Sequence, residues 1–94
     1  MPNTSAVSIQ VTGAEGAAKS SPGVVYWVAV SAGATGGAFQ LNDSTDDSGT
    51  DMLNLSVAAN STQFISFIGA PIHFNTGIFV DIPGTNLTVN VGYA

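Results

Sequence analysis

The stretch Gly23–Val30 limits the fold more than any other part of the chain. It contains the only tryptophan and a run of β-branched and aromatic residues, which suit a pleated, half-buried surface. A strand with water on one side alternates apolar and polar residues. Here one face is wholly apolar and the other mostly so, which predicts a central strand covered on both faces. The residues expected to face the core are Val24, Tyr26, Val28 and Val30.

Short segments of alternating apolar and polar residues fill most of the remaining chain. They recur roughly every 8–12 residues and are separated by Gly, Pro or Asn, a pattern typical of β-sandwiches and barrels. The clearest are Val7–Val11, Phe39–Leu41, Leu53–Val57, Ile78–Ile82 and Leu87–Tyr93. The sequence therefore predicts an all-β fold, a single-domain antiparallel β-sandwich of jelly-roll-like type, with about eight short strands. This domain spans residues 6–94 and follows a flexible N-terminal arm over residues 1–5.

Glycine-rich segments predict where the chain turns. Gly33–Gly37 directly follows the central apolar run, and a glycine break in this position is typical of a β-hairpin. Gly13–Ser21 is small and polar, and its glycines favour a loop over a short helix. We therefore expect a hairpin at the first segment and a surface loop at the second.

Charge excludes several classes of function. Only 7% of the residues are charged, against about 25% in ordinary soluble domains. Lys19 is the only basic residue beside six acidic ones, and the net charge is −5. Nucleic-acid binding requires clustered Lys and Arg, so neither nucleic acid nor an anionic membrane surface is an expected partner. No apolar stretch approaches the ~18–20 residues of a membrane span.

The N-terminus bears on export, and the absence of cysteine bears on cross-links and metal binding. Met1–Ser5 has neither a basic start nor an apolar h-region, so we expect synthesis in a cytoplasm without a classical export signal. Without cysteine there is no disulfide framework and no thiolate metal site. Hydrophobic residues make up 45% of the chain, which argues against a disordered protein because disorder requires low hydrophobicity.

Candidate catalytic residues are few. His73 is the only histidine, and Asp81 is expected nearby on the adjoining strand. A catalytic triad also needs a positioned nucleophile and oxyanion donors, and the sequence contains no G-x-S-x-G motif. Paired carboxylates for glycoside hydrolysis would need two acids on facing strands, and Asp81 is the only acid expected in a strand. We therefore expect no enzyme, no catalytic residue and no cofactor.

Acidic residues gather in the segment Asp43–Asp51. Side-chain oxygens of this kind bind calcium, but the spacing does not match the EF-hand loop because a terminal glutamate is missing. We therefore interpret the segment as a solvated acidic turn that supports solubility, and no metal site or small-molecule ligand is expected.

Several large apolar residues lie on the faces opposite the expected core. They are Val25, Trp27, Met52 and Phe79, together with either the pair Phe64 and Ile68 or the pair Ile65 and Phe67. Two interpretations remain open: a loop such as Gly13–Ser21 folds over them, or neighbouring subunits cover them. The second interpretation makes them a subunit or capsid interface. The polar arm Met1–Ser8 would extend this interface by crossing to a neighbour as an added strand, so that Ser5 and Val7 join it.

The order of strands and turns also resembles a known group of proteins. The matching pieces are the Val24–Val30 strand, the Ser31–Gly37 turn, the acidic Asp43–Thr50 loop and the ending Phe74–Tyr93 with its Asn75-Thr76-Gly77 turn. Over residues 22–94 the chain resembles small β-sandwich virion proteins of tailed bacteriophages, particularly head decoration or cement proteins. Because similar sandwiches occur in tail and fibre proteins, the resemblance implies a virion structural role more firmly than a place on the head.

This resemblance sets the functional expectation. It implies a non-enzymatic virion protein that is made in the host cytoplasm, self-associates as a homotrimer and stabilises the capsid surface through contacts with the major capsid protein. The alternative is a tail, fibre or adhesin-type binding module for carbohydrate, in which exposed Trp27 or Tyr93 stacks on sugar.

Overall fold

The computed structural model describes residues 7–12, 15–83 and 87–94 of the chain, and within these ranges it contains strands and no helix. No described segment forms a helix long and apolar enough to cross a membrane. The strands are β1 (Val7–Thr12), β2 (Gly16–Lys19), β3 (Gly23–Ala32), β4 (Gly37–Asp43), β5 (Thr50–Val57), β6 (Thr62–Ser66), β7 (Ile72–Phe74), β8 (Ile78–Asp81) and β9 (Leu87–Tyr93).

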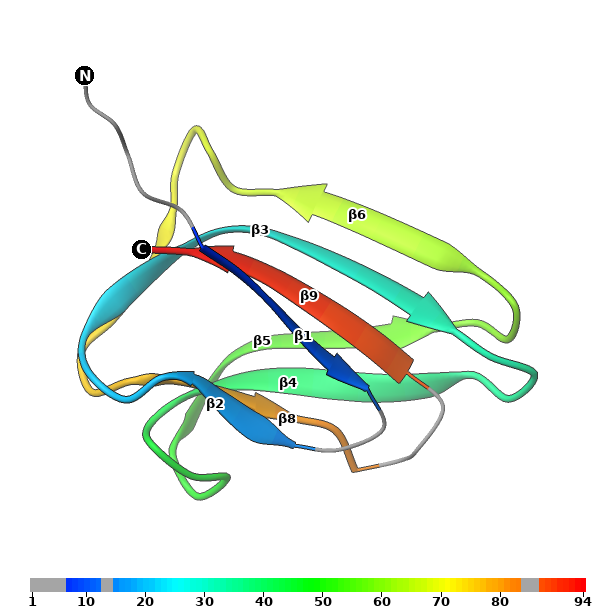
Figure 1. Ribbon diagram of the computed structural model, residues 1–94, viewed down its shortest axis with the longest axis horizontal. Helices are drawn as coiled ribbons and strands as arrows, with labels where there is room; N and C mark the ends of the chain where they lie inside the picture. The colour runs from blue at the N-terminus through cyan, green and yellow to red at the C-terminus, as the bar shows by residue number, and fades with distance from the viewer. Residues whose placement is uncertain (1–6, 13–14, 84–86) are drawn as a thin grey trace.

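The strands form two antiparallel sheets that pack face to face (Figure 1). Sheet A has the order β1-β9-β3-β6, with β7 also paired to β3, and sheet B has the order β2-β8-β4-β5. Because β6 pairs with Trp27–Ser31 and β7 with Gly23–Val25, these two short strands together fill one strand position beside β3. The resulting order is that of a jelly roll. The expected all-β, jelly-roll-like sandwich is therefore confirmed.

Two predicted connections are wrong, and the jelly-roll order explains both. Gly33–Gly37 does not close a hairpin, since it carries the chain from β3 in sheet A to β4 in sheet B. A Cβ atom on Gly36 would lie 2.5 Å from the carbonyl oxygen of Val57, so glycine permits the close approach of these two segments. Part of the Gly13–Ser21 segment is not a loop either, because Gly16–Lys19 pairs with β8 as the edge strand β2 of sheet B.

The central strand β3 contains an irregularity that reverses which of its residues face the core. The backbone N–H and C=O of Val24 bond to Ala94 on one side, whereas the carbonyl of Tyr26 accepts from Phe67 on the other. In a regular strand both residues would point the same way. The register with β9 shifts between Val25 and Trp27, so β3 carries one extra residue at this point, a β-bulge.

Because of the bulge, the residues of the first half of β3 that face the core are not the ones predicted. Val25 is fully buried, whereas Val24 and Tyr26 are only half-buried, and beyond the bulge Val28 and Val30 are buried as expected. The alternation observed in the sequence therefore held only for the second half of β3. Placing Val25 among outward-facing interface residues was wrong, because the extra residue turns its side chain into the sandwich.

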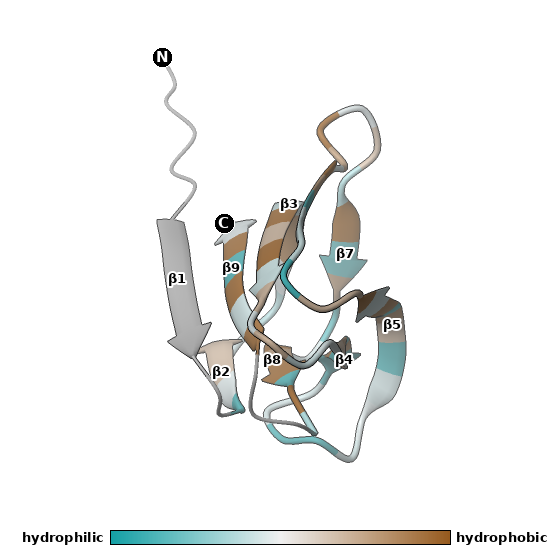
Figure 2. Ribbon diagram, turned by 90° about the vertical axis from the view of Figure 1, so that its right-hand side faces the viewer, coloured by the Kyte–Doolittle hydropathy of each residue, from teal (hydrophilic) through white to brown (hydrophobic). Residues whose placement is uncertain are grey.

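The core lies between the sheets and comes mainly from β3 and β9 on one side and from β4 and β8 on the other. Figure 2 shows apolar residues along the strands of both layers. The largest fully buried apolar side chains are Phe39, Leu41, Phe74, Ile78, Leu87 and six of the valines. Most of the apolar faces predicted for the later strands are therefore confirmed, with Leu53, Leu55 and Tyr93 partly buried against this core.

We expect Val25→Ala to destabilise the fold more than Val24→Ala, although the sequence pattern ranks them in the opposite order. Truncation of the fully buried Val25 leaves a cavity and costs about 2–3 kcal/mol in the free energy of unfolding, while truncation of half-buried Val24 costs below about 1 kcal/mol. Urea unfolding of both variants measures the difference. Equal losses would contradict the bulge.

Candidate functional site

The charged side chains lie on one side of the sandwich. All six acidic residues and the single lysine belong to sheet B, to the loop 44–49 between β4 and β5, or to the residue preceding β2. They are Glu15, Lys19, Asp43, Asp46, Asp47, Asp51 and Asp81. The strands of sheet A contain none of them, and its only titratable side chains are Tyr26, His73 and Tyr93. The molecule therefore has one acidic sheet and one sheet without formal charge.

Asp43, at the end of β4, has a structural role. Its carboxylate accepts hydrogen bonds from the backbone N–H groups of Thr76 at 2.7 Å, Asn75 at 3.1 Å and Gly77 at 3.4 Å. These bonds, that of Thr76 above all, favour the ionised form and lower the pKa of Asp43. The carboxylate therefore fixes the connection between β7 and β8. Its ionised form stabilises the fold at pH values above its ordinary pKa of 3.8, and this stabilisation is lost as the pH falls below 3.8 and through the lowered pKa.

Two further acids of the predicted acidic turn are also held by local bonds. Asp46 Oδ1 accepts from the hydroxyl of Ser48 at 2.6 Å and from its backbone N–H at 2.9 Å, and the hydroxyl bond is the main cause of its lowered pKa. Asp51 Oδ1 accepts from Nδ2 of the fully buried Asn42 at 2.5 Å. These contacts are those of an internally bonded turn, so a calcium loop formed by Asp43–Asp51 alone is not supported.

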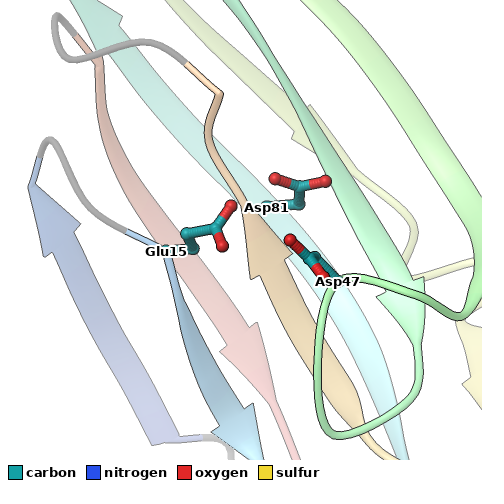
Figure 3. A group of neighbouring side chains, drawn as sticks. All are labelled: Glu15, Asp47 and Asp81. Atoms are coloured by element: carbon teal, nitrogen blue, oxygen red, sulfur yellow. The ribbon is translucent and has the colours of Figure 1, made fainter.

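Asp47 instead joins two acids from elsewhere in the chain. Its loop brings its carboxylate toward Asp81 on β8, and Glu15 reaches the same point from the start of β2 (Figure 3). One carboxylate oxygen from each of the three lies within 4.8 Å of the others. Asp81 is half-buried, and the other two residues are exposed. The sequence gives no sign of this cluster, because its three acids are far apart along the chain and only the pairing of β2 with β8 brings Glu15 beside Asp81.

Mutual proximity changes the protonation of this cluster. A hydrogen bond with Asp81, reduced hydration and the negative charges of Asp81 and Asp47 raise the pKa of Glu15 from its ordinary 4.5 to about 7. Carboxylate oxygens are the ligands that a hard cation such as Ca²⁺ binds, and three are present here. Exposed acidic groups commonly gather without an ion, so the cluster alone does not define a metal centre.

His73 and Asp81 do not form the pair considered from the sequence. β7, which carries His73, pairs with β3 in sheet A, whereas β8, which carries Asp81, lies in sheet B. His73 is exposed and its neighbour Phe74 is buried, while Asp81 stands between buried Val80 and Ile82. The two side chains therefore point away from the core on opposite sides of the sandwich. The expectation that Asp81 lies on the strand adjoining His73 is wrong.

An aromatic pair lies on the outer face of sheet A. The rings of Trp27 on β3 and Phe64 on β6 have centroids 5.9 Å apart and are tilted by 35°. Trp27 is half-buried, since its indole lies against Gly92 of β9, where a Cβ atom would collide with the ring. Phe64 remains 64% exposed. The surrounding positions on the same face are uncharged and polar: Ser31, Thr62, Ser66, Thr88 and Asn90.

The residues expected at an interface do not form one surface. Trp27 lies on sheet A, whereas Met52, 37% exposed, and half-buried Phe79 belong to sheet B. Ser5 and the arm over residues 1–5 lie outside the described residues, and Val7 is placed only as the first residue of β1. Of the two pairs left open on β6 and its following turn, Phe64 and Ile68 are the exposed one, at 64% and 67%. Both faces of this segment are apolar, so its sequence alone did not distinguish them.

Comparisons with known proteins do not place the chain in a family. No family model, no curated protein sequence and no solved structure matches it. A functional interpretation therefore depends on the arrangement of its own residues.

We expect the acidic cluster to make thermal stability depend on pH between about 4.5 and 7. Because the folded-state pKa of Glu15 is raised, its protonated form is favoured in the fold, and stability is lost as the pH rises through about 7. The melting temperature of the wild type should therefore fall by a few degrees from pH 5 to pH 8. Glu15→Gln, which keeps a hydrogen-bond donor and cannot ionise, should reduce this fall.

Asp46→Asn is the matched control, because the lowered pKa of Asp46 places its effect below pH 3.8. It should leave the change between pH 5 and pH 8 intact. A flat wild-type profile, or the same fall in Glu15→Gln, would contradict the coupling of Glu15 to its neighbours.

Proposed function

We propose that this chain is a non-enzymatic structural protein of a bacteriophage virion, which decorates the capsid and cements its subunits. The proposal combines the resemblance to phage head decoration proteins with one observation: every Asp, Glu and Lys side chain belongs to sheet B, to the loop between β4 and β5 or to the residue before β2. Its partners are the major capsid protein and further copies of the chain, and its location is the outer surface of the capsid after synthesis in the host cytoplasm.

The distribution of charge supports a defined orientation. Burial of a charged group against a partner costs free energy unless the charge is paired, whereas the uncharged outer face of sheet A carries no such penalty. Its aromatic pair, exposed Phe64 and half-buried Trp27, adds apolar area that contributes about 25 cal/mol per Å² when buried, before the costs of association. Sheet A would therefore face the shell, and acidic sheet B would face solvent and keep the particle soluble.

We expect the purified protein to bind heads of the encoding phage that were assembled without it. Co-sedimentation should saturate at a fixed number of copies per head, because cementing sites repeat with the capsid lattice. Phe64→Asp, which places a charge on the outer face of sheet A, should weaken binding at least tenfold, since an unpaired charge would be desolvated.

Met52→Asp is the control, because Met52 is an exposed apolar residue on sheet B. It should bind as the wild type does. Failure of the wild type to bind heads would overturn the proposal, and equal binding by both variants would overturn the orientation.

The aromatic pair also favours the alternative, a tail, fibre or adhesin-type module that binds carbohydrate. Aromatic rings on a sheet face with neighbouring hydroxyl and amide groups such as Ser66 and Asn90 present stacking and hydrogen-bonding groups together. On a glycan array this alternative predicts binding of neutral glycans by the wild type and its loss in Trp27→Ala, with Met52→Ala unchanged. An array without binding would exclude the alternative and leave the capsid role in place.

A further inference from the structure

Strand β6 forms one edge of sheet A (Figure 1). It pairs with β3 through the register Trp27–Ser66, Ala29–Phe64 and Ser31–Thr62, and its other side is open among the described residues. An open strand edge offers unpaired N–H and C=O groups to another strand.

The hydrogen bonds at the two ends of β6 show which of its residues face the open side. Phe67 donates to the carbonyl of Tyr26, and the carbonyl of Ser61 accepts from Ala32. The odd-numbered residues of this segment therefore direct their backbone groups toward β3. Because successive residues alternate, the even-numbered residues Thr62, Phe64 and Ser66 direct theirs outward.

The open edge lacks the features that keep natural edge strands apart. Such edges usually carry lysine, an inward-pointing charge, proline or a bulge. β6 has the sequence Thr-Gln-Phe-Ile-Ser and pairs with β3 in regular register. Its central outward residue, Phe64, is 64% exposed, and Ile68 in the following turn is 67% exposed. The edge is therefore both unguarded and partly apolar.

We propose that β6 pairs with β6 of a second copy of this chain, antiparallel and about a two-fold axis through Phe64. In this register Phe64 faces Phe64 of the other copy, and Thr62 faces Ser66. All three are residues with outward backbone groups, so each pair exchanges two hydrogen bonds as in a regular antiparallel ladder. No residue needs to shift for this match, because the outward residues are spaced symmetrically about Phe64.

Side chains on the outer face support the same pairing. Residues directly opposite each other in an antiparallel pair have Cβ atoms about 4.5–5.5 Å apart, which brings the two Phe64 rings into contact. Each ring already packs against Trp27 at 5.9 Å between centroids. The two copies would therefore share a continuous row of four aromatic rings across one uncharged sheet.

Charge does not oppose a second copy at this edge. The chain carries a net charge of −5, so most contacts between two copies would bring acidic groups together. Pairing along β6 brings uncharged edges into contact, and the acidic cluster of Glu15, Asp47 and Asp81 lies toward the opposite edge of sheet B, on β2 and β8. An interface formed by the same strand on both copies closes at two. This refinement of the self-association in the proposed function therefore replaces the expected trimer with a dimer.

Sedimentation equilibrium of the purified protein, without heads, tests the pairing. The wild type should pass from its monomer mass of 9.5 kDa to twice that mass with rising micromolar concentration. Ser66→Pro removes an outward N–H and no bond to β3, so it should fold and weaken the dimer at least about tenfold. Ser66→Ala keeps the N–H and should dimerise as the wild type does.

Hydrogen exchange of the wild type gives a second measurement that needs no variant. The amides of Thr62, Phe64 and Ser66 should gain protection as the concentration rises, while the amides of Gln63 and Ile65 are protected at every concentration by β3. A monomer at all concentrations, a trimer, or unchanged exchange at these three amides would overturn the proposal. A monomer that still binds heads would overturn only the pairing, and a dimer that fails to bind heads would overturn only the capsid role.

Discussion

The extra residue in β3 determines how this sandwich closes. β3 is the strand to which β9, β6 and β7 all pair, so its register positions the whole of sheet A. Without the bulge, Val25 and Val28 could not both face the core, because residues an odd number of positions apart lie on opposite faces of a regular strand. With it, the first half of the strand buries Val25 while the second half presents Trp27 to the outer face.

The two sheets give the molecule two outer faces, and the acidic side chains lie on the side of only one of them. Each sheet buries one face against the other, so its remaining face determines what the molecule presents to its surroundings. Sheet B presents carboxylates that are held by turns, by Asn42 or by one another. Sheet A presents hydroxyls, amides and an aromatic pair. A chain with so few charged residues can still have two chemically distinct surfaces, because its charged side chains all lie on the side of one sheet.

Much of the fold was readable from the sequence, and the errors have two causes. Period-two alternation and glycine spacing predicted the sandwich and the inward residues of β4, β8 and β9. A local pattern does not show which strands pair. For this reason the sequence predicts a hairpin at the glycine segment after β3 and a loop in place of β2. It also predicts that Asp81 lies beside His73, whereas the structure places Asp81 beside Glu15. A bulge leaves no local signal when both faces of a strand are apolar, and Val25 was misplaced for this reason.

The nesting of the strands has a consequence for how the chain acquires its fold. β4 and β5 are consecutive neighbours in one sheet, while β3–β6, β2–β8 and β1–β9 pair over progressively greater separations along the chain. Non-local pairing of this kind slows folding because long loops must close before they are stabilised. β9 lies between β1 and β3, so sheet A cannot be completed until the last strand has emerged from the ribosome. Until then β3, which is apolar on both faces, lacks its pairing with β9. An apolar strand with an unpaired edge makes a chain prone to aggregate during this interval.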